Sequence, residues 1–554
     1  MQIRIKHIVV LISFFICFSC GVSKSLKDVP NVSQYVKPQF KREQITDTVF
    51  VINNDFLSKN KVGSWELFVS GNPLELGDKT GSLTQELFVN QEAVFLSKVN
   101  DLVPSKFKQY LLKRFLAWYN RKMYLHVPEE YKTEIYGLSK YASKEYNHIA
   151  NEYLRVLYLH GAHDIGHALK DLALVGCSSF AVWGDKTEDG KLLIARNFDF
   201  YAGDEFAKNK IIAFITPEKG YKFMSVTWAG MIGVVSGMNE QGLTVTINAG
   251  KSKIPLVAKT PISIVTREIL QYASTIEEAI EIAKKRQVFV SESIMVGSAK
   301  DNKAVIIEVS PENFGVYEVE NTSKLICSNH FQSEAYKNDK NNQKHIEESH
   351  SKYRYLKMEE LLEEDEKITP KKAVAILRNK EGLEGKSIGY GNEKALNQLL
   401  AHHGIVFQPY DKLVWVSSNP YQLGKFVAYD LDDIFNGKTS KYNLSNDDLL
   451  IEEDEFLYTE QYKKYEKYRV LERQIERKIA DKEQIDSKTL KNYIDDNSDF
   501  WKVYFLTGKY YYLKGYYKAA LEMFLKAKSK EVTTKQDVRT IEKYIKKSTR
   551  KLTR

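Results

Sequence analysis

A change of sequence texture at residue 177 most constrains the fold of this chain. From there to about residue 250, short apolar runs alternate with turn signals such as Glu188-Asp189-Gly190, a pattern typical of strands. Helical periodicity follows over residues 262–285, and strand-like runs return at 293–331 and 404–420. Strands, then helices, then strands again predict stacked antiparallel sheets with helices outside, which is an α+β fold.

Several local features refine this prediction. Thr275 and Glu278 have the spacing of a helix N-cap, and Asp411-Lys412 stands where the turn of a closing hairpin is expected. The glycines of Gly71–Leu83 are spaced as turns between short strands. The charged stretch 332–379 reads as an insertion with helices.

Residues 88–174 have helical periodicity. His160, His163 and His167 lie on or near one face of the expected helix, which makes a metal site conceivable. The arrangement is not HExxH, and no acidic partner is placed for a metal. We therefore expect packing or capping roles, and we predict neither a metal nor a cofactor.

The first twenty residues have the pattern of a targeting segment. Positive residues precede the apolar run Ile8–Phe18, which is too short for a mature transmembrane helix. Ser19-Cys20-Gly21 follows and resembles a bacterial lipoprotein site. We expect a signal peptide at 1–19, lipidation of Cys20 and export to the periplasm, outer membrane or cell surface. An ordinary secretory signal cut nearby is the alternative.

Length and charge bound the remaining organisation. A chain of 554 residues has room for two or three domains. The net charge of +9 is mild, its charges are interleaved, and no nucleic-acid motif accompanies them. We therefore expect a solvated charged surface and no nucleic-acid partner.

We predict five segments along the chain. Residues 445–554 are helical, and 506–528 have the small-residue spacing of one tetratricopeptide-like hairpin, with a plain docked hairpin as the alternative. The segments are a signal peptide (1–19), a tether (20–60), a mostly helical N-terminal segment (61–176), a main domain (177–444) and a helical extension (445–554).

Four cysteines are present: Cys17, Cys20, Cys177 and Cys327. Cys17 leaves with the signal peptide and Cys20 would carry lipid, so two remain and form no disulfide framework. A Cys177–Cys327 bridge is one possibility. An unpaired thiol in an oxidising compartment suggests that the thiol is used.

Cys177 lies between Gly176 and two serines at the head of an expected strand. A thiol with a pKa of about 8.5 needs a base. The α-amino group of the cysteine itself, with a pKa of about 7.7–8.0, can serve if the preceding peptide bond is broken. Gly176 suits that break because it lacks Cβ and tolerates strained backbone.

An ordered set of motifs resembles the N-terminal-nucleophile hydrolases, and within them the acyl-coenzyme A:6-aminopenicillanic acid acyltransferase branch, a relative of the choloylglycine hydrolases. The resemblance covers roughly residues 65–430 and implies a four-layer αββα sandwich. The motifs are Gly176–Phe180, Asp189–Lys191, Arg196-Asn197-x-Asp199, Gly237–Asn248, Ser328–Phe331 and the upstream Gly71–Leu83.

The resemblance implies a role for each matching residue. Cys177 would be the nucleophile, freed by self-cleavage after Gly176, and residues 20–176 would remain bound as an α-chain. Arg196 and Asp199 would orient the thiol and the amine, with a plain ion pair as the alternative. Asn248 and Asn329 would donate to the oxyanion, although each could instead serve a turn or cap.

The implied reaction is attack of Cys177 on an N-acyl amine, giving a thioester that water or a second amine resolves. Hydrolase and acyltransferase share every residue, and no particular substrate is indicated. His330 could contact substrate or simply pack. One alternative is a papain-like enzyme using Cys177 with His330 or His402, which would place the cysteine on a helix. Another is a non-enzymatic lipoprotein that binds a partner through its helical tail.

Overall fold

The computed structural model describes residues 21–161, 176–200, 203–253, 257–364 and 367–553. The predicted signal peptide, the predicted lipidation site Cys20, and His163 and His167 lie outside these residues. Among the described residues, no helix combines the length and the apolar character that crossing a bilayer requires.

The first sheet contains eleven strands of the described chain, and its neighbours run antiparallel except for the parallel pair β4–β7. In spatial order the strands are β1 (Glu43–Thr46), β2 (Val49–Ile52), β3 (Asp55–Lys59), β4 (Trp65–Gly71), β7 (Ile211–Pro217), β8 (Phe223–Thr227), β9 (Ser236–Asn239), β10 (Leu243–Ala249), β11 (Glu292–Ser298), β12 (Lys303–Val309) and β13 (Phe314–Tyr317).

The second sheet contains seven strands of the described chain and is antiparallel throughout. The predicted closing hairpin is present as β15–β16, with Asp411 and Lys412 between the strands. In spatial order the strands are β14 (Lys324–Cys327), β5 (Ser178–Val182), β6 (Leu193–Phe198), β15 (His403–Gln408), β16 (Leu413–Ser417), β17 (Phe426–Asp430) and β18 (Asn446–Ile451).

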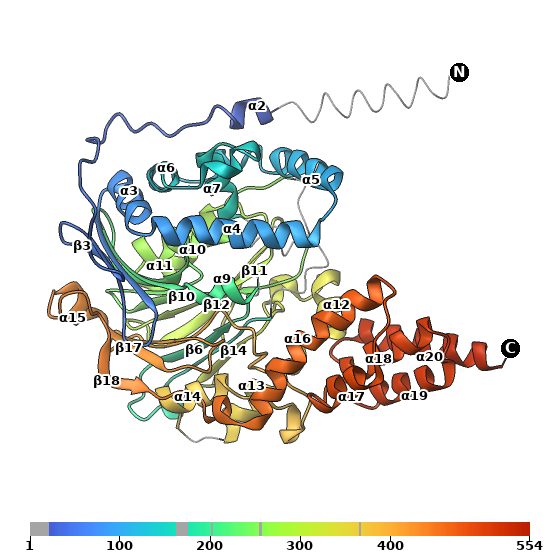
Figure 1. Ribbon diagram of the computed structural model, residues 1–554. Coiled ribbons are helices and arrows are strands. Elements are labelled where there is room, and N and C mark those ends of the chain that lie inside the picture. Colours follow the sequence, from blue (N-terminus) through green and yellow to red (C-terminus); the bar gives the residue numbers. More distant parts are fainter. Residues whose placement is uncertain (1–20, 162–175, 201–202, 254–256, 365–366, 554) are drawn as a thin grey trace, which may run out of the picture.

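Helices cover both outer faces of the paired sheets (Figure 1). The main helices are α3 (Pro73–Leu83), α4 (Gln85–Leu102), α5 (Lys106–Tyr119), α6 (Glu129–Ser139), α7 (Glu152–His160), α10 (Ile262–Tyr272), α11 (Ile276–Lys285), α12 (Lys340–Glu348), α13 (Ser351–Glu364) and α14 (Pro370–Leu377). Shorter helices are α2 (Val22–Ser25), α9 (Asp204–Lys208) and α15 (Leu431–Phe435), with 3-10 turns at Met123–Leu125, Lys144–His148, Gly184–Lys186, Glu334–Tyr336, Leu383–Gly385 and Glu455–Tyr458.

Three apolar layers hold the sandwich together. Side chains such as Phe214 of the first sheet and Ile405 of the second meet between the sheets. A second layer packs α3, α4, α6, α7, α10 and α11 on the outer face of the first sheet. A third packs α13 and α14, through Met358 and Val374, on the second sheet. The predicted α+β fold with four αββα layers is confirmed.

Part of the N-terminal prediction is wrong. Residues 43–59, expected within a tether, form β1–β3 and extend the first sheet. Most of Gly71–Leu83, expected as turns between strands, is helical: Gly71 ends β4, and α3 runs over Pro73–Leu83 because Asn72 and Glu75 build a capping box at its start. A Cβ on Gly77 would lie 1.9 Å from the Glu134 carbonyl oxygen, so this glycine permits close packing of α3 on α6.

The C-terminal extension is helical as predicted, but it begins later than residue 445, because β18 belongs to the second sheet. In α18 and α19, Gly508 faces Phe524, where a Cβ would lie 2.8 Å from the ring. The likeness to a tetratricopeptide repeat stays a prediction. The helices of the extension are α16 (Glu460–Ala480), α17 (Ser487–Asp495), α18 (Trp501–Leu513), α19 (Tyr517–Lys528) and α20 (Lys535–Leu552).

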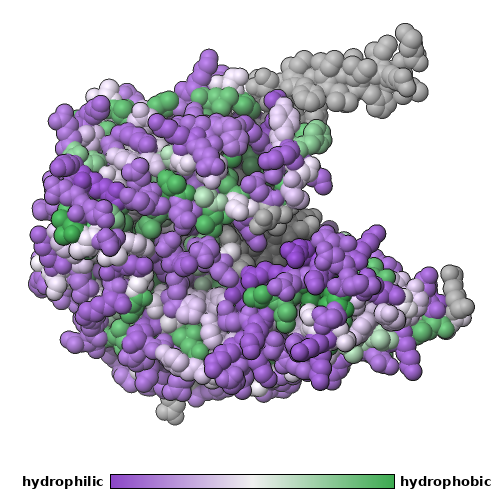
Figure 2. Space-filling model, in the orientation of Figure 1, coloured by the Kyte–Doolittle hydropathy of each residue, from purple (hydrophilic) through white to green (hydrophobic). Residues whose placement is uncertain are grey.

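The extension docks on the main domain. Lys535 and Arg539 of α20 pair with Glu347 and Glu348 of α12. Figure 2 shows the face of the molecule hollowed between the N-terminal helices and this extension.

The predicted helix cap is also present, since the Thr275 side chain accepts the Glu278 backbone N–H at the start of α11.

Candidate active site

Cys177 lies directly before strand β5 and is completely buried. A strand rather than a helix follows it, which is contrary to the papain-like alternative. Its thiol and that of Cys327 are both free, so the possible disulfide is not formed. Burial raises the pKa of the Cys177 thiol, although the charge of Arg196 acts in the opposite direction. The uncut cysteine is therefore a poor nucleophile at neutral pH.

Arg196 is placed beside the thiol by the pairing of two strands. β5 and β6 are antiparallel, with Ser179 opposite Arg196, and the guanidinium Nη2 lies 3.6 Å from the Cys177 Sγ. The same group donates to the main-chain carbonyls of Val235, at 2.6 Å, and Ile247. These bonds fix the guanidinium in a site where burial lowers its pKa.

Asp199 follows β6 and lies next to the predicted cleavage position. Its main-chain carbonyl accepts the Gly176 N–H at 3.3 Å. The carboxylate is buried, and neither of its oxygens has a hydrogen-bond partner among the described residues. Burial raises its pKa to about 7, while the charges of Arg354 and Arg196 act against this rise. Burying a carboxylate that accepts no hydrogen bond costs free energy. A cation placed beside Asp199 would therefore be stabilising.

The two predicted oxyanion residues are brought to the same region. The Asn248 Nδ2 donates to the carbonyls of Cys327 and Ser328 at 3.1 and 3.2 Å, and its Oδ1 accepts the Ser179 hydroxyl at 3.1 Å. The Asn329 Nδ2 donates to the Ala249 carbonyl at 2.9 Å. In the uncut chain both amides thus hydrogen-bond β10 to the end of β14 and the residues that follow it. Their oxyanion role stays a prediction.

Arg354 is a site residue that the sequence did not single out. It projects from α13, is completely buried, and its Nη1 donates to the Cys177 carbonyl at 2.6 Å and to the Ser178 hydroxyl at 2.8 Å. Its Nη2 donates to the Asn329 Oδ1 at 2.6 Å. Burial lowers its pKa to about 10, so it remains a cation at neutral pH. It lies in the stretch read as a charged insertion, where nothing local distinguishes it from surface arginines.

Two buried histidines are connected to the thiol through Arg196. The His403 Nε2 lies 2.9 Å from the Ser236 hydroxyl, which also accepts a bond from Arg196. The Nδ1 atoms of His402 and His403 lie 2.9 Å apart. Burial holds the pKa of both rings well below the usual range, so both are neutral. His402 is therefore linked to the Cys177 thiol through His403, Ser236 and Arg196. This is contrary to its role in the papain-like alternative.

The other singled-out histidines have structural partners. The His330 Nδ1 lies 2.8 Å from the Ser351 hydroxyl. The His160 Nε2 accepts the Ile232 backbone N–H at 3.0 Å, which agrees with a packing role. Within the described residues there is no cluster of three or more His, Cys, Asp or Glu side chains able to hold a metal.

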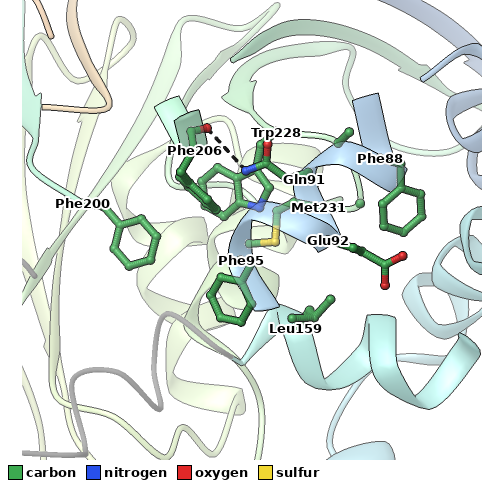
Figure 3. A pocket seen from close by; sticks show the side chains of 11 residues that line it. Phe88, Gln91, Glu92, Phe95, Leu159, Phe200, Phe206, Trp228 and Met231 are labelled. Atoms are coloured by element: carbon green, nitrogen blue, oxygen red, sulfur yellow. Dashed lines mark hydrogen bonds between the residues drawn. The ribbon is translucent and has the colours of Figure 1, made fainter. Parts of the chain in front are cut away.

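An aromatic pocket (Figure 3) lies beside His402, whose ring centroid is 5.5 Å from that of the pocket residue Trp228. Phe200 lines it, stands next to Asp199 in the chain, and stacks on Trp228 with ring centroids 6.1 Å apart. Polar groups are few, and Gln91 uses its amide on the Phe206 carbonyl at 3.4 Å. Such a lining suits an apolar chain. The residues that line the pocket are Phe88, Gln91, Glu92, Phe95, Leu159, Phe200, Phe206, Trp228, Ala229, Gly230 and Met231.

Comparison with known proteins gives distant relatives. An uncharacterised protein of Archaeoglobus fulgidus is 25% identical over 277 residues, 46% of this chain and 45% of that protein. The N-acylethanolamine-hydrolyzing acid amidase of Caenorhabditis elegans is 24% identical over 213 residues, 36% of this chain and 57% of that protein. The chain thus spans about half the length of the curated relatives it matches.

Among solved structures, a conjugated bile acid hydrolase variant of Clostridium perfringens is 17% identical. The matched region covers 48% of this chain and 94% of the hydrolase chain, with a TM-score of 0.32. The model of the acyl-coenzyme A:6-aminopenicillanic acid acyl-transferase family matches residues 186–418. This match contains Arg196, Asp199, Asn248, Asn329 and Arg354, and it confirms the resemblance carried by the motifs. Over residues 186–418, the chain is therefore similar to the acyl-coenzyme A:6-aminopenicillanic acid acyl-transferase family.

Proposed function

We propose that this protein is a cysteine-nucleophile amide hydrolase or acyltransferase that acts on N-acyl amines after cleaving itself between Gly176 and Cys177. The observation that carries the proposal is the juxtaposition of a buried thiol, a fixed arginine and a buried carboxylate without a bonded partner. The thiol of Cys177 lies 3.6 Å from the Arg196 guanidinium. The main-chain carbonyl of Asp199 accepts the N–H of Gly176, the residue before Cys177.

Self-cleavage supplies what the uncut site lacks. It creates an α-amino group on Cys177 with an ordinary pKa of about 7.7–8.0, suited to a base at neutral pH. The positive form of this amine is expected to pair with Asp199, which is a buried carboxylate without a hydrogen-bond partner among the described residues. The charge of the mature site would then balance, and the amine would be held beside the thiol.

The reaction proceeds through a thioester. The α-amino group takes the proton of the thiol, and the sulfur attacks the acyl carbonyl carbon. Collapse of the tetrahedral intermediate breaks the C–N bond, and the leaving amine takes the proton back from the α-ammonium group. Water or a second amine then displaces the sulfur. Arg354, Asn248 and Asn329 are the groups from which oxyanion stabilisation is expected.

The pocket and one relative support a substrate class. The aromatic lining that includes Phe200 favours an apolar acyl group, and the C. elegans relative is named for the hydrolysis of N-acylethanolamines. We therefore expect N-acyl amines with an apolar acyl group. Hydrolysis and acyl transfer differ only in the acceptor.

Location is part of the same proposal. The apolar run Ile8–Phe18 followed by Cys20 supports a lipoprotein signal. Lipid at Cys20 would tether an exported enzyme to a membrane, with the main domain outside the bilayer.

Denaturing intact mass tests the proposal. The purified wild-type chain is expected to give two fragments that divide between Gly176 and Cys177, and Cys177→Ala a single uncut chain. Cys327→Ala, which alters the other buried free cysteine, is the matched control and is expected to cleave like the wild type. A panel of N-acyl amines then measures turnover by the cleaved protein. An uncut wild type would contradict the proposal and favour a partner-binding lipoprotein.

A further inference from the structure

The carbonyl of the bond proposed to break has a single side-chain donor among the described residues. The Gln398 Nε2 donates to the Gly176 oxygen at 2.8 Å, and Gln398 is only 2% exposed. We infer that Gln398 is the oxyanion donor of the self-cleavage step, a role separate from turnover of substrate. This inference rests on the self-cleavage proposed above.

The same side chain explains the glycine at position 176. A Cβ there would lie 2.4 Å from the Gln398 Nε2 and 3.0 Å from its Cδ, closer than real side chains approach one another. Any larger residue at 176 would push the amide away from the carbonyl. The glycine is thus required by the donor that packs on it.

The step balances without an outside reagent other than water. The Cys177 sulfur bonds to the Gly176 carbonyl carbon, and the carbonyl π electrons move to the oxygen that Gln398 holds. The C–N bond then breaks as the nitrogen takes the thiol proton, which leaves a thioester and a free α-amino group. Water displaces the sulfur, giving the Gly176 carboxylate and the Cys177 thiol. The donor acts where negative charge develops.

The backbone around Gln398 is strained in a way that fixes the donor. Leu399 has φ 54°, a left-handed conformation that is uncommon for a leucine. Its N–H is held by the Asn397 Oδ1 at 3.0 Å, and the Asn397 N–H by the Asn379 carbonyl at 2.8 Å. Strain of this kind persists only where the surroundings impose it.

The surroundings that impose it come from the C-terminal extension. The Tyr465 hydroxyl of α16 donates to the Leu399 carbonyl at 3.3 Å, and Leu399 packs in the apolar core of the extension. Earlier in the same loop, the Asn392 amide donates to the Glu531 carbonyl at 3.0 Å, and Lys394 pairs with the Glu531 carboxylate at 2.5 Å. The extension therefore holds the loop that presents Gln398 to the scissile bond.

The test is the rate of self-cleavage, followed by denaturing mass at intervals after synthesis of the full chain. Gln398→Ala removes the donor, and Gln398→Met keeps a side chain of similar length that cannot donate. Each is expected to cleave about 10²–10³-fold more slowly, the usual loss of one oxyanion donor. Gln271→Ala is the matched control, because Gln271 is also a buried glutamine whose amide donates to a main-chain carbonyl, that of Lys219. It is expected to cleave at the wild-type rate.

Each outcome separates this inference from the proposed function. A wild-type chain that stays uncut overturns self-cleavage and this inference together. A wild-type chain that cleaves, with both Gln398 variants cleaving at its rate, overturns the donor alone. A slow alanine variant beside a fast methionine variant also overturns it, because packing rather than donation would then be sufficient. Thermal unfolding of each variant establishes that it is folded.

Discussion

Replacing Asp199 by Asn is expected to stabilise the uncut precursor above neutral pH. Burial raises the pKa of Asp199 from its ordinary value of 3.8 to about 7. A carboxyl with a raised pKa binds its proton more tightly in the folded state, so stability falls as pH rises from about 3.8 to about 7 and then levels. The shift of about 3 pKa units corresponds to about 4 kcal/mol at pH 8, using about 1.4 kcal/mol per unit.

The assay is urea unfolding of the uncut Cys177→Ala chain with and without Asp199→Asn. The neutral amide avoids the cost of an ionised buried group, so we expect a gain approaching 4 kcal/mol at pH 8 and almost none near pH 4. Asp55→Asn is the contrasting control, since Asp55 is buried but paired with Lys79 at 2.7 Å, and it should lose stability at pH 8. Equal effects of Asp199→Asn at both pH values would refute the reasoning.

Three further predictions follow from named contacts. Arg354→Met should lower kcat/KM of the cleaved protein for an N-acyl amine by about 10²-fold or more, because the mutation removes the cation bonded to the Cys177 carbonyl. An unchanged kcat/KM would show that Arg354 does not contribute to turnover. Iodoacetamide should label Cys177 of the cleaved protein, because its new α-amino group can take the thiol proton, and should leave Cys327 unlabelled, because burial strongly raises the pKa of that thiol. Peptide mass mapping measures both labels, and a label on Cys327 without one on Cys177 would contradict the prediction. Gly77→Ala should destabilise the chain by about 3 kcal/mol or more in urea unfolding, because its Cβ would meet α6 backbone at 1.9 Å.

The sequence was sufficient where neighbours in space are also near in the chain. Cys177 directly precedes β5 and Arg196 lies on the next strand, β6, so recognising these two paired strands already places the residues close together. Asp199 is the first residue after β6. The layered fold was predictable for the same reason, because strand and helix periodicities are local signals.

What could not be predicted depends on contacts between distant segments. Arg354 reaches the site from a helix 177 residues beyond Cys177, and Gln398 meets Gly176 across 222 residues. Nothing near either residue in the sequence marks it. Gly77 misled for a different reason, since a glycine that permits helix packing has the same appearance in sequence as a glycine in a turn.

The central claim is that Cys177 becomes an N-terminus. Sequencing from the amino end of the larger fragment of the purified wild-type protein tests it most directly. The account predicts that this fragment begins Cys177-Ser178-Ser179 and that the Cys177→Ala chain yields no such fragment. An intact wild-type chain, or a fragment that begins at another residue, would contradict the account.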